Sequence, residues 1–480
     1  MFSSGTGKKI SAPAAFIVTL VLAGAALYHW LHLSALPALD ARMPGGDGRP
    51  AVREVEETPV DFTGRFETFD GTPSTLPGAW PRFRGPNYDN IAWDAPPLAD
   101  AWGDDGPPIL WTIELGEGYA GPAVLGGRVY VLDYDEEARA DALRCFSLDD
   151  GREIWRHAYD VEVRRNHGMS RTVPAVTEAY VVSIGPRCHV LCLDAQTGAF
   201  QWGIDLQREH GAEEPLWYTG QCPLIEDDAV ILAPAGPDAL MMAVALADGA
   251  TRWKTPNPMG WRMSHSSVMP MTLAGKRMYV YAAVGGVAGI SAEGDDVGTL
   301  LWRIPWDAHI VAPSPVAVGE DRVLALAGYG AGALLFEVRR TDAGFEAREI
   351  SRHGPRDGIA SEQHTPIVYE DHIYAIMPKD AGAMRAQFVC HRPDGALVWS
   401  SGEGYRFGLG PWLLADGKFF VLDDEGILYL LRATPERFEL LDQARVLHGH
   451  ESWGPLALAG DRLIVRDLDR MACVFVGASP

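Results

Sequence analysis

Short apolar segments recur along most of the chain, and each follows a turn that contains Gly or Asp. The clearest are residues 127–132, 179–184, 276–281, 321–326, 372–376 and 418–422. Because they are rich in β-branched and aromatic residues and are bounded by turn residues, they predict β-strands. One stretch differs: Pro13 to Leu33 holds roughly 20 residues without Asp, Glu, Lys or Arg, a length that predicts a membrane-spanning helix.

A second pattern gives the strands a period. An Asp-Gly or Thr-Gly turn is followed within a few residues by Trp, at Trp155, Trp202, Trp253, Trp302 and Trp399. Counted from Trp111, the steps are 44 to 51 residues, and the 97 residues between Trp302 and Trp399 hold a unit without its Trp. With another degenerate unit near Leu441, the chain contains eight units of about 48 residues, each with room for four short strands.

Four-stranded units at this period predict the blades of an all-β, eight-bladed propeller, in which each Trp packs between blades. The last unit, which offers residues 458–466 and 471–476, lacks a terminal Trp strand. Residues 109–115 form a strand with no unit of their own. Pairing these two ends of the repeat region closes the ring and hides its sheet edges.

The N-terminal segment divides the chain further. Lys8 and Lys9 precede the apolar stretch and acidic residues follow it, which places the first residues in the cytoplasm and the rest outside. We expect a cytoplasmic stub and transmembrane anchor at 1–38, a flexible tether at 39–78 and the propeller at 79–480. A cleaved signal peptide is the alternative, because small residues such as those at 35–38 follow the stretch.

Composition and charge exclude several classes of protein. The chain has 41 basic and 64 acidic residues, a net charge of -23, and no run of Lys and Arg, so nucleic acid is not an expected partner. Hydrophobic residues make up 47% of the chain, enough for a folded core. The six cysteines form no C-x-x-C pair, which leaves covalent haem and paired-thiol zinc sites without support.

The repeats and one further block carry a family resemblance. The Asp-x-x-Thr-Gly-x-x-x-Trp units, their number, and the block Trp80-Pro81-Arg82-Phe83-Arg84-Gly85-Pro86-Asn87 before the first strand resemble the bacterial pyrroloquinoline-quinone-like (PQQ-like) β-propeller proteins. The resemblance covers about residues 79 to 480. The group includes quinoprotein alcohol dehydrogenases, BamB-like outer-membrane assembly factors and many anchored proteins of unassigned role, so it implies the fold and leaves the function open.

The resemblance also implies which enzyme features to look for. Quinoprotein enzymes of this fold hold the quinone on the central axis with a calcium ion, a catalytic Asp and a ring made by two adjacent, disulfide-bonded cysteines. This chain has no adjacent cysteines and no recognisable counterpart of the calcium-binding carboxylates. We therefore assign no catalytic residue, and PQQ with calcium is expected as a cofactor only if the chain is an enzyme.

The expected ligand site is the mouth of the central channel, where the segments that lead into the innermost strands converge. These segments supply the candidate cofactor- or ligand-binding residues Arg171, Gln221, His265, His309, His364, Arg406 and Trp453. Such residues suit an anionic or aromatic ligand. If the ligand is a quinone, Arg171 pairs with its carboxylate, Trp453 stacks on its ring and a histidine serves as base. A solvated collar of loops is the alternative.

Three other motifs provide weaker evidence of a binding site. Residues 116–121 match G-x-G-x-x-G, but a strand and not a helix follows, so we reject a dinucleotide site. His448 and His450 alternate as a metal-binding pair would, yet channel-lining histidines are the preferred interpretation. The acidic clusters at 133–137 and 423–425 are typical of hairpin turns, and we predict no metal site.

Together these features predict an inner-membrane-anchored propeller that faces the periplasm, or a secreted one if the N-terminus is cleaved. We expect it to bind other envelope or membrane proteins, or a small molecule in its central channel, without turning the ligand over. The alternative function is a PQQ-dependent oxidoreductase acting on alcohols or sugars. A scaffold like BamB is a third function, which predicts co-purification with membrane-embedded machinery.

Overall fold

The structure, a computed structural model, describes residues 12–33, 59–164 and 167–478. It divides into two compact units, Met1–Pro59 and Val60–Pro480. In the first, α1 (Ala12–Leu33) is a helix, as the apolar stretch predicts. Within the described residues, however, no helix has the length and apolar character needed to cross a membrane, so the expected transmembrane role is not supported.

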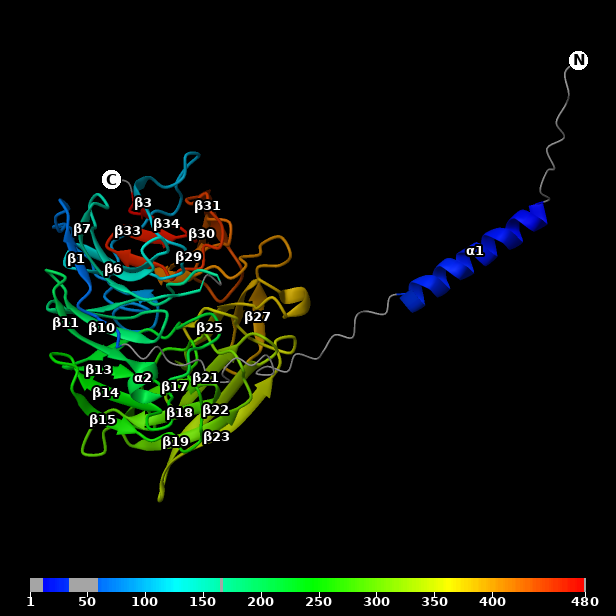
Figure 1. Ribbon diagram of the computed structural model, residues 1–480. Helices are drawn as coiled ribbons and strands as arrows, with labels where there is room; N and C mark the ends of the chain where they lie inside the picture. Colours follow the sequence, from blue (N-terminus) through cyan, green and yellow to red (C-terminus); the bar gives the residue numbers. More distant parts are fainter. Residues whose placement is uncertain (1–11, 34–58, 165–166, 479–480) are drawn as a thin grey trace, which may run out of the picture. The chain divides into compact units, whose positions relative to one another are not determined.

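The second unit is a ring of eight antiparallel sheets, the predicted propeller (Figure 1). First strands of neighbouring blades contact each other, as β4 does with β8 and β32, which places them innermost. The first four blades, named in chain order, are blade 1 with β4 (Ala123–Leu125), β5 (Arg128–Asp135), β6 (Ala140–Ser147) and β7 (Glu153–Asp160); blade 2 with β8 (Ala175–Val176), β9 (Tyr180–Ile184), β10 (His189–Asp194) and β11 (Phe200–Asp205); blade 3 with β12 (Leu224–Glu226), β13 (Ala229–Leu232), β14 (Met241–Ala245) and β15 (Thr251–Thr255); and blade 4 with β16 (Met269–Leu273), β17 (Lys276–Ala283), β18 (Gly285–Ser291) and β19 (Leu300–Trp306).

The other four blades follow the same order and include both units that lack a Trp in the repeat. They are blade 5 with β20 (Val316–Ala317), β21 (Arg322–Ala327), β22 (Gly332–Thr341) and β23 (Gly344–His353); blade 6 with β24 (Ile367–Tyr369), β25 (His372–Ile376), β26 (Phe388–His391) and β27 (Leu397–Ser400); blade 7 with β28 (Trp412–Ala415), β29 (Lys418–Leu422), β30 (Ile427–Arg432) and β31 (Leu440–Arg445); and blade 8 with β32 (Ala457–Ala459), β33 (Arg462–Arg466) and β34 (Arg470–Phe475). Two short helices interrupt the pattern, α2 (Leu206–His210) after blade 2 and η1 (Gly382–Met384) within blade 6.

The ring closes where the sequence predicts. β3 (Ile109–Glu114) pairs antiparallel with β34 and completes blade 8, so that early and late parts of the chain lie side by side (Figure 1). Arg466 at the end of β33 reinforces this closure. Its buried guanidinium donates to the backbone oxygens of Gly116 at 2.8 Å and Ala120 at 3.2 Å, which lead into blade 1.

Two N-terminal segments add strands to the blades. β1 (Arg65–Thr68) pairs antiparallel with β7 at the outer edge of blade 1, and β2 (Ile91–Ala92) pairs parallel with β28 at the inner edge of blade 7. Of the expected tether at 39–78, residues 39–58 lie outside the described part. The rest is held against the propeller by β1, so the compact unit begins at Val60 and not at residue 79.

The repeat Trp packs between blades, as predicted. Trp111 donates from Nε1 to the backbone oxygen of Leu148 at 3.0 Å, and Trp202 makes the same bond to Leu246 at 2.9 Å. In each case the acceptor lies in the next blade, just before its Gly turn. The Trp of one blade and the turn of the following blade therefore form one contact, which explains why both recur at the same period.

Candidate functional site

The segments that lead into the innermost strands meet at one end of the axis, as expected, and line a cavity of about 120 Å³. Every blade except blade 7 contributes to its wall. The side chains that line it include Phe83, Tyr119, Arg171, Trp217, Cys222, His265, Tyr329, Glu362, His364 and Trp453. Four of the seven predicted residues are therefore brought together, namely Arg171, His265, His364 and Trp453.

Arg171 is positioned by pairing between two of these segments. Tyr119 donates its backbone N–H to the backbone oxygen of Ser170 at 2.6 Å, and Gly118 bridges to Ser170. The Arg171 guanidinium then lies over the Tyr119 ring, 4.8 Å from its centroid. Its Nε has no hydrogen-bond partner, and no carboxylate of the described residues lies within 4 Å of it. Burial lowers the pKa of Arg171 to about 10, so the side chain stays cationic at neutral pH.

Tyr119 and Trp453 form an aromatic pair beside Arg171. Their ring centroids are 5.0 Å apart, with 32° between the ring planes. Each polar end is fixed by a carboxylate, since Tyr119 Oη donates to Glu451 at 2.6 Å and Trp453 Nε1 donates to Asp424 at 2.7 Å. Burial raises the pKa of Tyr119, so the phenol is not a source of charge at neutral pH. The pair gives the cavity a rigid, apolar wall.

A second aromatic group was not predicted. Trp217 and Tyr329 have ring centroids 5.7 Å apart, and Lys379 Nζ lies 4.8 Å from the Tyr329 centroid. Lys379 Nζ also lies 2.7 Å from a carboxylate oxygen of Glu362. The Glu362 side chain is fully buried. The sequence offered a partial signal, because Glu362 and Trp217 lie in the same segments as the predicted His364 and Gln221. Tyr329 lies between β21 and β22, outside those loops, and carried no signal.

The two histidines of the cavity are neutral at physiological pH. Burial, joined by the charge of Arg171, lowers the pKa of His265 to about 4, and burial lowers that of His364 to about 4 as well. The Nε2 atom of His364 is buried without a hydrogen-bond partner, and its ring lies edge-on to Trp412 at 5.6 Å. These imidazoles can bond to a ligand, but with such low pKa values they are weak bases.

The other three predicted residues lie elsewhere. Gln221 exchanges two hydrogen bonds, of 3.1 and 3.0 Å, with the backbone of Ala233, so it fixes a loop and does not face the cavity. The His309 side chain is 82% exposed. Arg406 is half-buried and donates to the backbone oxygens of Arg385 and Ala383. Sequence reasoning placed these residues in the right segments but could not give the direction of each side chain.

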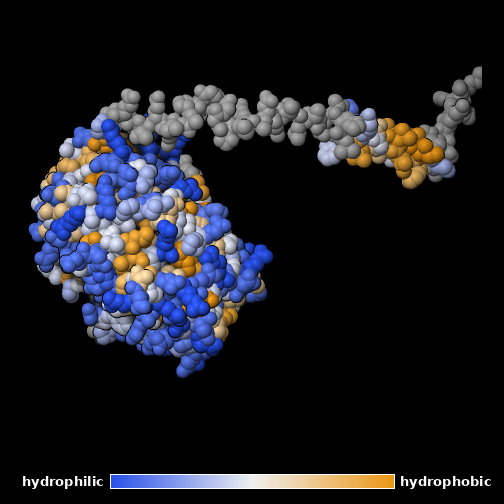
Figure 2. Space-filling model, turned by 90° about the horizontal axis from the view of Figure 1, so that it is seen from below, coloured by the Kyte–Doolittle hydropathy of each residue, from blue (hydrophilic) through white to orange (hydrophobic). Residues whose placement is uncertain are grey.

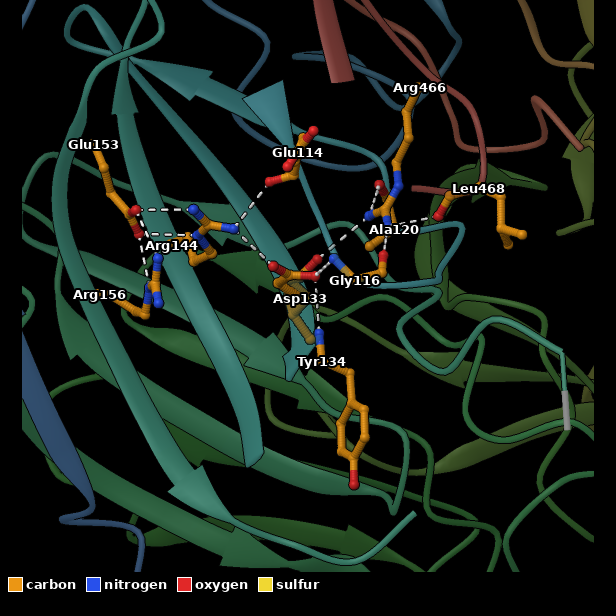
Figure 3. A network of polar contacts seen from close by, with 11 residues as sticks. Glu114, Gly116, Ala120, Asp133, Tyr134, Arg144, Glu153, Arg156, Arg466 and Leu468 are labelled. Atoms are coloured by element: carbon orange, nitrogen blue, oxygen red, sulfur yellow. Dashed lines mark hydrogen bonds and ion pairs between the residues drawn. The ribbon is translucent and has the colours of Figure 1, made fainter. Parts of the chain in front are cut away.

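The acidic clusters are not assembled into metal sites in the part of the chain that the structure describes, where no three His, Cys, Asp or Glu side chains could hold an ion. Asp133 instead accepts from Arg144 at 2.8 Å and from the backbone N–H of Gly116 at 2.6 Å (Figure 3). Arg144 also pairs with Glu153, which binds Arg156 (Figure 3). This network ties blade 1 to the closing segment and is structural.

Comparison with known proteins agrees with this fold. A family model described as outer membrane protein assembly factor BamB matches residues 101–214 and 139–387, together more than half of the chain. No curated protein sequence matches. Among solved structures, quinohemoprotein alcohol dehydrogenase from Comamonas testosteroni is 14% identical with a TM-score of 0.58, covering 84% of this chain and 81% of that one. A europium-containing methanol dehydrogenase is 12% identical with a TM-score of 0.54, covering 82% and 89%.

Proposed function

Because this chain belongs to the PQQ-like β-propeller family whose model is described as BamB, we propose that it is a binding protein that takes a small, planar carboxylate in its axial cavity. Arg171 binds the carboxylate, and the aromatic side chains around it contact the ring. The cavity of about 120 Å³ is smaller than the roughly 300 Å³ at the lower end of pockets for drug-sized ligands. A single aromatic ring is therefore the favoured size.

One observation carries the proposal. Arg171 is a cation in the wall of a cavity, without a carboxylate partner among the described residues and with a buried Nε that makes no hydrogen bond. A buried donor without a partner costs about 1–3 kcal/mol, which a ligand carboxylate would recover. His265 and His364 are neutral, so neither offers a positive charge to that carboxylate.

The residues present do not fit the cofactor of the quinoprotein enzymes. The described residues hold no cluster of three His, Cys, Asp or Glu side chains, so no set of carboxylates is assembled among them for the calcium that accompanies the quinone. The six cysteines are free, and none are adjacent. The cavity also offers a single arginine. We therefore keep the quinone-dependent oxidoreductase only as the alternative function.

Calorimetric titration of the full-length chain tests the proposed function. Benzoate is the probe, and benzamide, which has the same ring without a charge, is the matched control. The proposal predicts saturable benzoate binding that is at least about tenfold tighter than benzamide binding, as expected for loss of a charge-assisted bond. Equal affinity, or no binding to the folded chain, would overturn it. Titration with pyrroloquinoline quinone in the presence of calcium tests the alternative function, which predicts that the quinone binds.

Partner proteins and membrane attachment are separate proposals. Hydrophilic side chains dominate the face seen in Figure 2, with small apolar patches among them. On the outer strand of blade 6, Leu397 and Val398 are 49% and 38% exposed, which favours contact with another protein. From the sequence pattern alone, Lys8 and Lys9 before a charge-free stretch at 13–33, we propose an N-terminal inner-membrane anchor with the propeller in the periplasm. Sequencing the mature N-terminus, with carbonate extraction of membranes, tests that placement.

A further inference from the structure

The block Trp80–Asn87, first noted as a family marker, crosses the axis of the propeller. Trp80 exchanges two backbone hydrogen bonds of 2.8 Å with Val124 of β4, and Pro81 accepts from Val176 of β8 at 2.8 Å. A few residues later, Asn90 accepts from Leu414 of β28 at 3.1 Å. β4 and β8 are the innermost strands of blades 1 and 2, and β28 is that of blade 7. Between these contacts Arg84 reaches the segment before β24 of blade 6, which lies opposite blade 2 in a ring of eight, so the block crosses the axis.

Arg84 holds the Trp80–Asn87 block in this position. Its side chain is 4% exposed and donates to the backbone oxygens of Thr365 at 3.1 Å and Pro366 at 3.0 Å, directly before β24. It also holds its own segment through the backbone oxygens of Tyr88 and Asp89, at 2.8 and 3.1 Å. A buried cation that makes four such bonds fixes the block in one position.

Phe83, between Arg82 and Arg84, faces the cavity. Its side chain is part of the cavity wall and packs against two separate hydrophobic clusters, one around blades 1 and 8 and the other around blades 4 and 5. Apart from Tyr329, which lies between β21 and β22, the other lining residues lie before the innermost strands, at the mouth, whereas Phe83 belongs to the block that bonds to the strands themselves. The ring of Phe83 is therefore the inner end of the cavity.

We infer that Phe83 is the floor of the axial cavity and sets the size of the ligand that Arg171 binds. The inference rests on the proposed function and names the ligand class more closely, as aromatic carboxylates of one ring. A second fused ring directed into the channel would meet the Phe83 side chain, which lines the cavity. Shortening Phe83 should therefore change size selectivity without removing the carboxylate contact.

The first test measures selectivity by calorimetry. Full-length wild type and Phe83→Leu, Phe83→Ala and Phe83→Trp are each titrated with benzoate and with naphthalene-2-carboxylate. Wild type is expected to prefer benzoate by about tenfold or more, the range that small steric differences give in such pockets. The preference should fall in the order wild type, Leu, Ala, while Trp weakens both ligands. An unchanged ratio in Leu and Ala would overturn the role of Phe83.

The second test needs no ligand. Cys222 is a buried free thiol that also lines the cavity, and burial raises its pKa to about 11. Because Phe83 lines the same cavity, labelling of the native chain with monobromobimane at one fixed pH, with Cys222→Ser to identify the signal, reports how much room that cavity leaves for the reagent. The labelling rate should rise in Phe83→Leu and Phe83→Ala and fall in Phe83→Trp.

The two tests separate the two proposals. If benzoate does not bind but the labelling rate changes with the size of residue 83 as expected, the proposed function is refuted and the role of Phe83 as the floor is supported. Benzoate binding with labelling rates that ignore Phe83, and with the same selectivity in every variant, would keep the function and refute the inference.

Discussion

The indole ring of Trp155 lies directly against Gly198 of the next blade, so close that a Cβ on Gly198 would come within 2.7 Å of the ring. The same relationship joins Trp111 to Gly151, Trp202 to Gly249 and Trp253 to Gly298. These glycines also have positive φ, 73° at Gly198, which disfavours other residues. The repeat motif therefore reflects a contact between blades, to which one unit contributes the Trp and the next unit contributes the Gly.

Gly198→Ala should destabilise the propeller more than Gly395→Ala does. Both glycines occupy the repeat turn with positive φ, at 73° and 89°, but a Cβ on Gly395 would meet nothing within 4 Å. The difference isolates the clash with the rings of Trp155 and Phe66, each 2.7 Å from such a Cβ, and we expect about 1–3 kcal/mol from this overpacking. Thermal and urea unfolding of the two variants measure it. Equal losses would show that backbone conformation, and not the indole contact, explains the conserved spacing of the motif within this chain.

Arg466→Met should weaken the closure of the ring. It removes donors from the backbone oxygens of the partly buried Gly116 and the buried Ala120. We expect a loss of about 2–3 kcal/mol, from the cost of depriving such groups of a donor. Arg252→Met is the control, because Arg252 pairs with the exposed Asp228 at the surface, where solvent screens the ion pair. Unfolding at a Tm indistinguishable from that of Arg252→Met would contradict the role given to Arg466.

Asp141 should make stability depend on pH. Burial raises the pKa of its carboxyl to about 7, and Oδ2 accepts from Tyr159 at 2.9 Å. The folded chain thus keeps a proton that the unfolded chain releases near pH 4, so the stabilising contribution is full below about pH 4 and is lost as pH rises through 7.

Asp141→Asn should remove this dependence and, above pH 7, be more stable than wild type by roughly 1–4 kcal/mol. Urea unfolding between pH 4 and 9 measures the effect, with the exposed Asp228→Asn as control. The test is the difference between the wild-type and Asp141→Asn profiles, because buried histidines with pKa values of about 4 add their own pH dependence to both. A difference that is constant from pH 4 to 9 would refute the assignment.

The sequence predicted the fold more completely than the site. Blade number, closure through residues 109–115 and the packing role of the repeat Trp all follow from turn spacing and strand composition, which are local properties. The cavity is different. Gln221 and Arg406 lie in the predicted segments, but their side chains bond to Ala233 and Ala383 and turn away. Tyr329, Phe83 and Glu362 reach the cavity through contacts between distant blades, which no local pattern encodes.

Benzoate affinity should be nearly constant between about pH 5.5 and 8.5. Arg171 has a pKa of about 10 and His265 and His364 have pKa values of about 4, so none of the three changes charge in this interval. Above about pH 10 the affinity should fall as Arg171 loses its proton. Calorimetry in buffers matched for ionic strength provides the profile. A change of tenfold or more centred near pH 6.5 would mean that a histidine carries charge in the site.

The central claim is that Arg171 binds the carboxylate of a ligand in the axial cavity. The most direct measurement is benzoate titration of Arg171→Gln beside Arg406→Gln, two substitutions that remove the same charge from collar segments of the same propeller. Arg406 is half-buried, donates to the backbone oxygen of Ala383 and does not line the cavity. The account predicts that Arg171→Gln weakens benzoate at least about tenfold, the cost of one charge-assisted bond, while Arg406→Gln binds as wild type does. Equal affinity in the two variants would contradict it.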